Sequence, residues 1–170
     1  VLFGDGAGAA VVEAVPEGYG FRSFVIGTDG SGGPFLHKRS VGRCLPGGTP
    51  LSDTLYMNGR EVFKFAVRVM DTATLEAIGK AGMTPDDIGV FVPHQANLRI
   101  IEAARERLGL PPERVIVTVD RYGNNSTASI PLALKVGLTE GRIKNGDNLL
   151  LVAFGAGLTW AATVLTWGGV

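Results

Sequence analysis

The stretch that decides the fold is Ile88-Gly89-Val90-Phe91-Val92-Pro93-His94-Gln95-Ala96-Asn97. Its first part is a short apolar run of the kind that forms a buried strand. Its second part is polar and leads into Leu98 to Leu108, where apolar residues recur at helical spacing. A strand that runs directly into a helix is the first half of a βαβ unit.

The same alternation continues toward the end of the chain. The pattern predicts strands at Val115 to Val119, Asn148 to Ala153 and Leu158 to Thr166, and a helix at Thr127 to Leu138. With the strand at 88–92 this makes a βαβαβ arrangement, in which helical crossovers join parallel strands. The last strand follows the turn Gly155-Ala156-Gly157 and should pair antiparallel with its predecessor. We therefore expect an α/β fold, a mixed sheet with a βαβαβ parallel core and helices on both faces.

The region before this core is less regular. Residues 9–15 and 21–26 are β-rich and flank the turn signal Pro16-Glu17-Gly18, which predicts a hairpin. Residues 28–54 are rich in Gly, Pro and Ser without a sustained period, and this indicates a long surface excursion. From Asn58 to Gly82, apolar residues at helical spacing predict a long amphipathic helix.

Composition limits the classes of protein that remain. The chain has 170 residues, 45% of them hydrophobic, which is enough for one globular domain over residues 1–170. No apolar run reaches the roughly 20 residues that span a bilayer, so we expect no membrane segment. The 16 Lys and Arg residues balance 16 Asp and Glu residues without a block of like charge, which argues against nucleic acid as a partner.

The single cysteine indicates the cellular compartment of the protein, and the N-terminus indicates whether the chain is complete. Cys44 has no second thiol with which to form an internal disulfide and no CxxC spacing, which favours a reducing, cytoplasmic setting. The chain begins with Val1, without an initiator methionine or a signal peptide. We therefore expect it to be a piece of a longer protein.

Polar loops follow the strands of the expected parallel core. In an open parallel sheet, ligands bind outside the carboxyl ends of the strands. Neighbouring strands about 4.8 Å apart would bring His94 and Asn124 into one cleft, with the backbone N–H groups of the glycine turn alongside. A histidine and an amide without a carboxylate suit hydrogen-bond donation to a developing negative oxygen.

The alternative interpretation is that these loop residues have a structural role only, as helix caps. Asn97, Asn124 and Ser126 stand where capping residues are expected, just before helical patterns. Capping explains the asparagines, but it does not explain His94.

Basic residues gather on the long predicted helix. Arg60, Lys64 and Arg68 are spaced i, i+4, i+8 and form one positive stripe, while Arg99 opens the helix after the His94 loop. This patch could steer an acidic partner or a phosphate, or it could be a solvated helix face.

Two further motifs carry no site. His37 stands beside Lys38 and Arg39 without Cys, Asp or Glu at ligand spacing, so we interpret it as a surface histidine and expect no metal site. The run Gly4-Asp5-Gly6-Ala7-Gly8 precedes a strand and lacks the third glycine of G-x-G-x-x-G, which argues against dinucleotide binding.

Four motifs together resemble a known family. They are Phe3-Gly4-Asp5-Gly6-Ala7-Gly8-Ala9, Val92-Pro93-His94-Gln95-Ala96-Asn97, Tyr122-Gly123-Asn124-Asn125-Ser126 and Ala153-Phe154-Gly155-Ala156-Gly157-Leu158-Thr159-Trp160. In this order they resemble the C-terminal half of β-ketoacyl-[acyl-carrier-protein] synthase III, a member of the thiolase superfamily. The resemblance implies a thiolase-like half of a layered sandwich of two similar halves, and a homodimer for the whole enzyme.

The resemblance also implies a Cys-His-Asn enzyme. A cysteine is acylated from acyl-CoA, and His94 and Asn124 stabilise the enolate that forms when malonyl-acyl carrier protein decarboxylates. The backbone N–H of Ala156 completes an oxyanion hole, and no cofactor is needed because acyl-CoA is a substrate. The remaining implied contacts are Asn97, Phe154 and Gly155 with CoA, and Arg60, Lys64, Arg68 and Arg99 with acyl carrier protein.

The chain departs from this family pattern in one important respect. The nucleophilic cysteine of such enzymes lies upstream of Val1, and Cys44 is in the wrong segment to replace it, so we expect this chain alone to be inactive. Tyr122 stands where many relatives carry histidine. Two alternatives remain open: another Cys-His-Asn synthase of the polyketide or alkylquinolone type, and a non-catalytic module that binds CoA or carrier protein.

Overall fold

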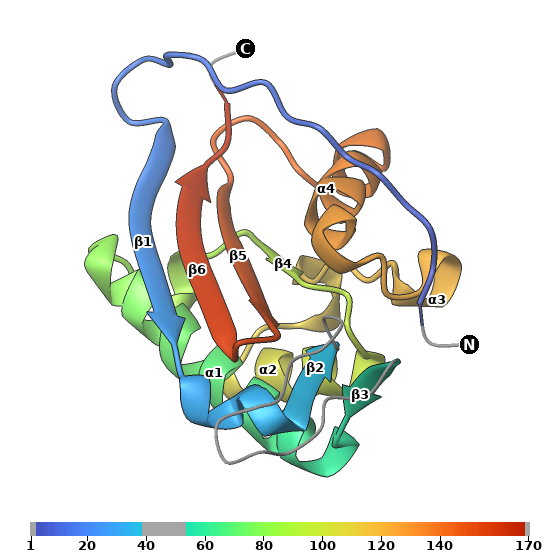
Figure 1. Ribbon diagram of the computed structural model, residues 1–170. Coiled ribbons are helices and arrows are strands. Elements are labelled where there is room, and N and C mark those ends of the chain that lie inside the picture. Colours follow the sequence, from blue (N-terminus) through green and yellow to red (C-terminus); the bar gives the residue numbers. More distant parts are fainter. Residues whose placement is uncertain (1–2, 39–53, 169–170) are drawn as a thin grey trace.

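A mixed sheet organises the part of the chain that the computed structural model describes, residues 3–38 and 54–168 (Figure 1). Its strand order is β1-β6-β5-β4. The strands are β1 (Gly20–Thr28), β4 (Val90–Pro93), β5 (Asn148–Gly155) and β6 (Thr159–Thr166). β4 and β5 are parallel, whereas β6 is antiparallel to both of its neighbours, β5 and β1. The mixed sheet and its antiparallel last strand confirm the α/β prediction.

Two helices cover one face of this sheet. They are α1 (Gly59–Lys80) and α2 (Leu98–Arg107). Asn58 begins α1, because its Oδ1 accepts the backbone N–H of Glu61 at 3.3 Å. The apolar stripe of α1, which includes Phe65, Ala66, Val69 and Met70, packs on the buried side chains of β1, β5 and β6. The long amphipathic helix is thus confirmed.

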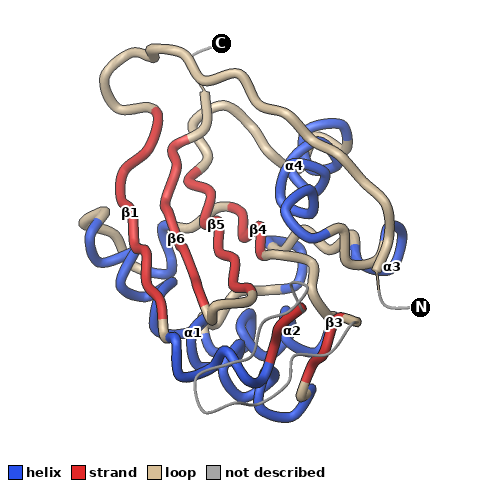
Figure 2. Tube along the Cα trace, viewed as in Figure 1, coloured by secondary structure: helices blue, strands red, loops and turns tan. Residues whose placement is uncertain are grey.

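The opposite face of the sheet is covered only in part. Helix α4 (Ser129–Thr139) packs over β4, where Ala133 meets Val90 and Val92 in a second, smaller core. In Figure 2 no helix lies in front of β1, β6 and β5 on this side. Phe24 and Ile26 on β1 are consequently 57% and 81% exposed.

The strand predicted at 115–119 is not formed, which corrects the βαβαβ expectation. Val115 makes one isolated parallel bridge with Phe91, and the chain then turns into the short helix α3 (Val119–Tyr122). The buried side chain of Gln95 takes the place of a strand ladder here. Its Nε2 donates to the carbonyl oxygens of Pro93 and Ile116, and its Oε1 accepts the N–H groups of Thr118 and Val119.

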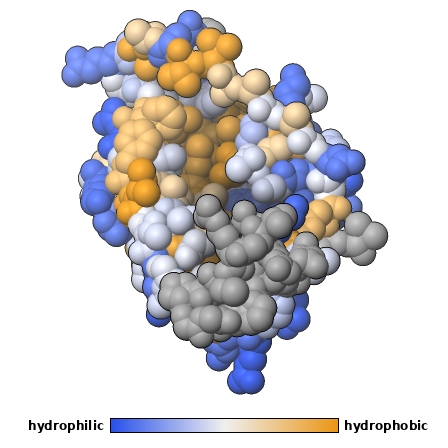
Figure 3. All heavy atoms as spheres, in the orientation of Figure 1, coloured by the Kyte–Doolittle hydropathy of each residue, from blue (hydrophilic) through white to orange (hydrophobic). Residues whose placement is uncertain are grey.

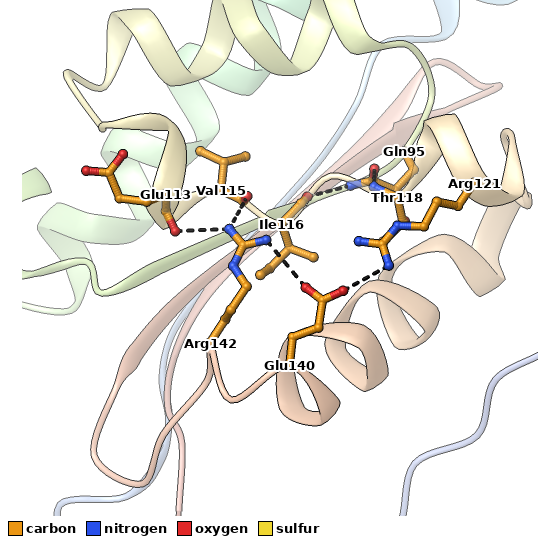
Figure 4. Close-up of polar contacts among 8 residues, drawn as sticks. All are labelled: Gln95, Glu113, Val115, Ile116, Thr118, Arg121, Glu140 and Arg142. Carbon is orange, nitrogen blue, oxygen red and sulfur yellow. Dashed lines mark hydrogen bonds and ion pairs between the residues drawn. The ribbon is translucent and has the colours of Figure 1, made fainter.

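Arg142 holds the same segment from its other side. Its Nη2 donates to the carbonyl oxygens of Glu113 and Val115, at 3.0 and 2.7 Å. Glu140 pairs with Arg121 beyond it, at 2.9 Å (Figure 4). Side chains thus satisfy backbone groups that a longer strand would have paired.

The hairpin predicted at 9–15 and 21–26 is wrong, because only its second arm forms a strand. Residues 4–19 instead cross the surface as an extended segment that passes α4 in Figure 1. The N–H of Gly4 donates to the carbonyl oxygen of Asn124 at 3.1 Å. A Cβ at Gly4 would stand 1.9 Å from the carbonyl oxygen of Tyr122, so this close approach requires glycine.

The irregular region after β1 carries a small second sheet. A 3₁₀ turn at Gly30–Phe35 leads into β2 (Leu36–Lys38), which pairs antiparallel with β3 (Leu55–Met57). Cys44 lies outside the described residues. No helix among those described is long and apolar enough to cross a membrane.

Candidate active site at the carboxyl ends of the parallel strands

A cavity of about 740 Å³ opens where β4 and β5 end. It is lined by residues from both sheets and from the loops that follow the parallel strands. Among them are the six expected site residues that are not basic: His94, Asn97, Asn124, Phe154, Gly155 and Ala156. The expectation that the strand-end loops share one cleft is met, although the roles of these residues stay predictions.

His94 is held firmly at the base of the cavity. Its backbone N–H donates to the carbonyl oxygen of Val152 at 2.7 Å, and its ring Nδ1 lies 2.6 Å from the hydroxyl of Ser129. The edge of the ring meets Phe154, with centroids 5.7 Å apart and planes at 72°. Burial lowers the pKa of His94 below its ordinary value, so the imidazole is neutral at pH 7.

Asn124 sits in a tight loop between α3 and α4. Its Oδ1 accepts the backbone N–H of Ser126 at 2.9 Å, which leaves the amide hydrogens of Nδ2 as its donors. Its backbone is bridged to Phe3 in the crossing N-terminal segment. A neutral imidazole and a carboxamide therefore face one cavity, and the described residues that line it include no Asp or Glu.

The glycine turn at 155–157 is fixed from outside the sheet. Leu158, which is buried, exchanges two backbone hydrogen bonds with Asp29, at 2.8 and 2.9 Å. Gly32 lies so close that a Cβ there would stand 2.4 Å from Leu158 Cδ1. These contacts hold the turn that presents Ala156, an exposed residue, at the cavity wall.

Asn97 serves as a helix cap as well as a cavity residue. Its Oδ1 accepts the N–H of Arg99 at 2.9 Å and begins α2, as the capping alternative expects. The residue is exposed and lines the cavity, so its Nδ2 group remains available as a donor.

The four basic residues lie outside the cavity. Arg60, Lys64, Arg68 and Arg99 are all exposed, and none is among the residues that line it. The Arg99 guanidinium lies over the ring of Phe63, 5.9 Å from its centroid, and Phe63 does line the cavity. Lys64 pairs with Glu61 at 2.8 Å. The structure thus places positive charge beside the cavity.

Sequence reasoning missed two parts of this site. Ser129, the partner of His94, looked like an ordinary residue of the helix predicted at 127–138. The apolar wall comes from β2, β3 and α1, and it includes Leu36, Leu55, Met57 and Phe63. Phe63 is 37% exposed on a helix most of whose apolar residues are buried, and it contributes to this wall, but exposure is not visible in a sequence.

The described residues contain no group of three or more His, Cys, Asp and Glu side chains that could hold a metal ion. His37, interpreted above as a surface histidine, is half-buried rather than fully solvated. Its ring stacks on Tyr56 with centroids 5.1 Å apart.

Residues 78–167 match the family model described as 3-oxoacyl-[acyl-carrier-protein (ACP)] synthase III C terminal. A β-ketoacyl-[acyl-carrier-protein] synthase III from Deinococcus deserti is 57% identical over 169 residues, which is 99% of this chain and 48% of that relative. The chain thus spans about half the length of the curated relatives it matches.

Solved structures agree with the sequence matches. A β-ketoacyl-[acyl carrier protein] synthase III from Thermus thermophilus superposes with a TM-score of 0.91 at 72% identity, covering 94% of this chain and 50% of that one. The priming β-ketosynthase of the R1128 polyketide pathway superposes with a TM-score of 0.77 at 38% identity, covering 88% and 46%.

Proposed function

Because the chain belongs to the 3-oxoacyl-[acyl-carrier-protein] synthase III family, as a C-terminal domain, we propose that it is one half of the condensing enzyme that initiates fatty acid synthesis. The reaction joins an acyl-CoA starter to malonyl-acyl carrier protein. The observation that carries this proposal is the cavity shared by His94, Asn124 and the glycine turn.

The proposed chemistry has two stages. In the first, a cysteine of the other half of the enzyme takes the acyl group from acyl-CoA and releases CoA. In the second, malonyl-acyl carrier protein loses CO₂, and its enolate carbon attacks the acyl carbonyl. A 3-oxoacyl-carrier protein forms, and the cysteine leaves as thiolate, so no cofactor is needed.

His94 and Asn124 would act on the second stage. Both offer neutral N–H donors, which stabilise a developing enolate oxygen without giving up a proton. The neutral state of His94 supports this role, because burial lowers its pKa. The pair lowers the barrier to decarboxylation in so far as it binds the enolate more tightly than the malonyl thioester.

The glycine turn would serve the acylated cysteine. The backbone N–H of Ala156 is the candidate oxyanion donor for the acyl carbonyl. The position of the turn supports this role. The turn is anchored by two backbone hydrogen bonds between Asp29 and Leu158.

The cavity wall suits a long, mostly apolar thioester arm. Asn97, Phe154 and Gly155 are the proposed contacts with CoA, and the apolar residues Met57 and Phe63 extend this wall. An arm with few charges matches a lining that holds amides and aliphatic side chains.

The basic patch would receive acyl carrier protein. Arg60, Lys64, Arg68 and Arg99 are exposed on α1 and at the start of α2, beside the wall residue Phe63. Positive side chains around a cavity mouth steer an acidic partner and orient it.

The other half of the enzyme would cover the bare face of the sheet. Apolar side chains of β1, β5 and β6 form a hollow beside α4 (Figure 3), lined among others by Phe24, Leu151, Ala161 and Ile130. A monomer seldom exposes such a surface. We therefore propose that residues 1–170 are one thiolase-like half and that this half alone is inactive. That the whole enzyme is a cytoplasmic homodimer is a separate proposal, in which the homodimer rests on the family resemblance.

A polyketide-type synthase is the second candidate, favoured by the likeness to the R1128 priming ketosynthase. A non-catalytic module that binds CoA or carrier protein is the third.

One experiment separates the three candidate functions: the full-length protein is incubated with labelled acyl-CoA and then with malonyl-acyl carrier protein. Acylation of one cysteine, followed by a 3-oxoacyl product with short starters, supports our proposal. Preference for a polyketide-type extension series, or absence of acyl transfer, contradicts it.

A further inference from the structure

Ser129 stands at the base of the active-site cavity, although it is not among the residues that line the cavity. It is the first residue of α4 and is only 1% exposed. Its Oγ lies 2.6 Å from Nδ1 of His94 and 3.3 Å from the backbone nitrogen of Gln95. The two contacts span 34 and 35 positions of sequence, so they are products of the fold.

The hydrogens of these three groups can be assigned by their chemistry. The N–H of Gln95 is only a donor, so it uses Oγ of Ser129 as acceptor. Within the described residues, Nδ1 of His94 is the acceptor that lies in reach of the Ser129 hydroxyl hydrogen. If Nδ1 carried the ring hydrogen instead, the buried hydroxyl would have two donors facing it and no acceptor for its own hydrogen.

We propose that Ser129 is a positioning residue that fixes His94 in the tautomer with the hydrogen on Nε2. The hydroxyl of Ser129 donates to Nδ1, so Nε2–H is the ring group left for the cavity. The opposite tautomer would aim a lone pair at the enolate oxygen and repel it. The tautomer assignment stands on geometry alone, whereas its catalytic use rests on the proposed function.

Two observations support a neutral, fixed ring. Phe154 packs against the ring at 72° and restricts its rotation. Burial lowers the pKa of His94, so the doubly protonated ring does not compete at pH 7. With the ring held and neutral, the remaining question is which ring nitrogen carries the hydrogen. The hydrogen bond from Ser129 to Nδ1 places it on Nε2.

The test is imidazole ¹⁵N NMR on the full-length protein labelled with ¹⁵N-histidine. His94 is assigned by its loss in His94→Gln. In the wild type we expect an unprotonated nitrogen at Nδ1 and a protonated one at Nε2. In Ser129→Ala we expect a substantial Nδ1-protonated population and a fall in kcat for malonyl decarboxylation of about 10-fold, smaller than the loss on deleting the donor itself.

Two variants control this experiment. Ser23→Ala removes another buried serine hydroxyl, whose Oγ accepts the N–H of Val164 at 3.2 Å; Ser23 does not line the cavity. It should leave both the tautomer and the decarboxylation rate unchanged. Ser129→Thr retains a hydroxyl at the same place and should keep the Nε2–H form.

The outcomes are distinct. Protonation of Nδ1 in the wild-type spectrum overturns the proposal, even if Ser129→Ala fails to fold. So does a Ser129→Ala protein whose tautomer and decarboxylation rate match the wild type. If the wild type holds the Nε2–H form but has no condensing activity, the proposed function fails while the assignment of Ser129 stands.

Discussion

At the scale of single residues, the proposed chemical centre is a neutral imidazole and a carboxamide that line the same cavity. Partial burial lowers the pKa of His94 and keeps its ring neutral, and the ring is fixed by Ser129 and Phe154. Asn124 is fixed by its own turn and by the N-terminal segment. Both side chains are held before substrate arrives, which is the condition under which hydrogen-bond donors stabilise a transition state most effectively.

The first prediction concerns these two donors. In the full-length protein, His94→Ala or Asn124→Ala should lower malonyl decarboxylation about 10²- to 10³-fold, because under the proposed function each removes one oxyanion donor. Transfer of the acyl group from acyl-CoA to cysteine should be kept at least in part. Rates of CO₂ release and of cysteine acylation, measured separately, check this division. An equal loss in both steps would contradict it.

The second prediction concerns pH. The pKa of His94 is lowered by burial, so below about pH 6.5, the usual imidazole value, the unfolded chain binds a proton that the folded chain does not. The free energy of unfolding should therefore fall as pH drops below about 6.5, until the folded-state pKa is reached. Urea denaturation from pH 8 to pH 5 measures it.

The matched control for this pH series is His94→Gln, which cannot titrate. The wild type should lose stability relative to His94→Gln on acidification. Parallel curves for the two proteins would show that burial of His94 has no effect on its titration.

At the scale of elements, the side chain of Gln95 supplies backbone hydrogen bonds to residues 115–119 that strand pairing would otherwise have made. Val115 pairs once with Phe91, and from there the side chain of Gln95 binds the backbone of the next segment through three hydrogen bonds, while a fourth ties it to the carbonyl oxygen of Pro93. The segment leads through α3 to the turn that carries Asn124. The residue next to His94 in sequence therefore also anchors the path to Asn124.

The third prediction follows from this arrangement. Gln95→Leu should lower the free energy of unfolding by about 3 kcal/mol or more, because it leaves buried backbone N–H and C=O groups without partners. Chemical denaturation measures the change. Thr72→Ala, which removes an exposed hydroxyl bond on α1, is the control and should cost less than about 1 kcal/mol. Similar small losses in the free energy of unfolding for both variants would mean that other groups can hydrogen-bond the backbone groups that Gln95 binds.

At the scale of the whole molecule, the sheet has one covered and one open face. α1 and α2 bury the first face, while β1, β6 and β5 present apolar side chains on the second. Since the chain spans about half of its relatives, we expect the other half to pack there. The cavity lies at the end of the same sheet, beside the basic patch.

The fourth prediction tests the open face. In the full-length protein, Phe24→Asp should destabilise or prevent folding, although Phe24 is 57% exposed here, because a charge would be buried between the halves. Leu75→Asp on α1, where Leu75 is 46% exposed, is the control and should be tolerated. Thermal denaturation distinguishes them. Equal melting temperatures would place the second half elsewhere.

The fifth prediction tests the basic patch. Arg99→Glu should reduce kcat/KM for malonyl-acyl carrier protein more than for acyl-CoA, since rim charges act on encounter with a large acidic partner. The wild-type rate should also fall as salt rises past about 0.15 M, where the Debye length is roughly 8 Å. Lys135→Glu, an exposed lysine on α4, is the control. Equal losses for both substrates would indicate a general anion site, and no loss would indicate a solvated helix face.

Local pattern was enough to predict most of the elements and the edge at which the site lies. Helical spacing identified α1, α2 and α4, and the position of His94 directly after a buried strand placed it at the carboxyl end of the sheet. Order along the chain was also enough to expect His94 and Asn124 in one cleft, because right-handed crossovers put successive loops on one edge.

Three features were decided only by the tertiary structure. The segment at 115–119 has a strand-like composition, but the side chain of Gln95 bonds its backbone before a ladder can extend. Residues 9–15 have no strand beside them, so they form no hairpin despite their β-rich composition. Ser129 reaches His94 from 35 positions away, and no local periodicity reports such a contact. The periodicity of apolar residues predicts which face of an element is buried. It does not predict long-range hydrogen bonds, because these depend on which elements pack against each other in the folded chain.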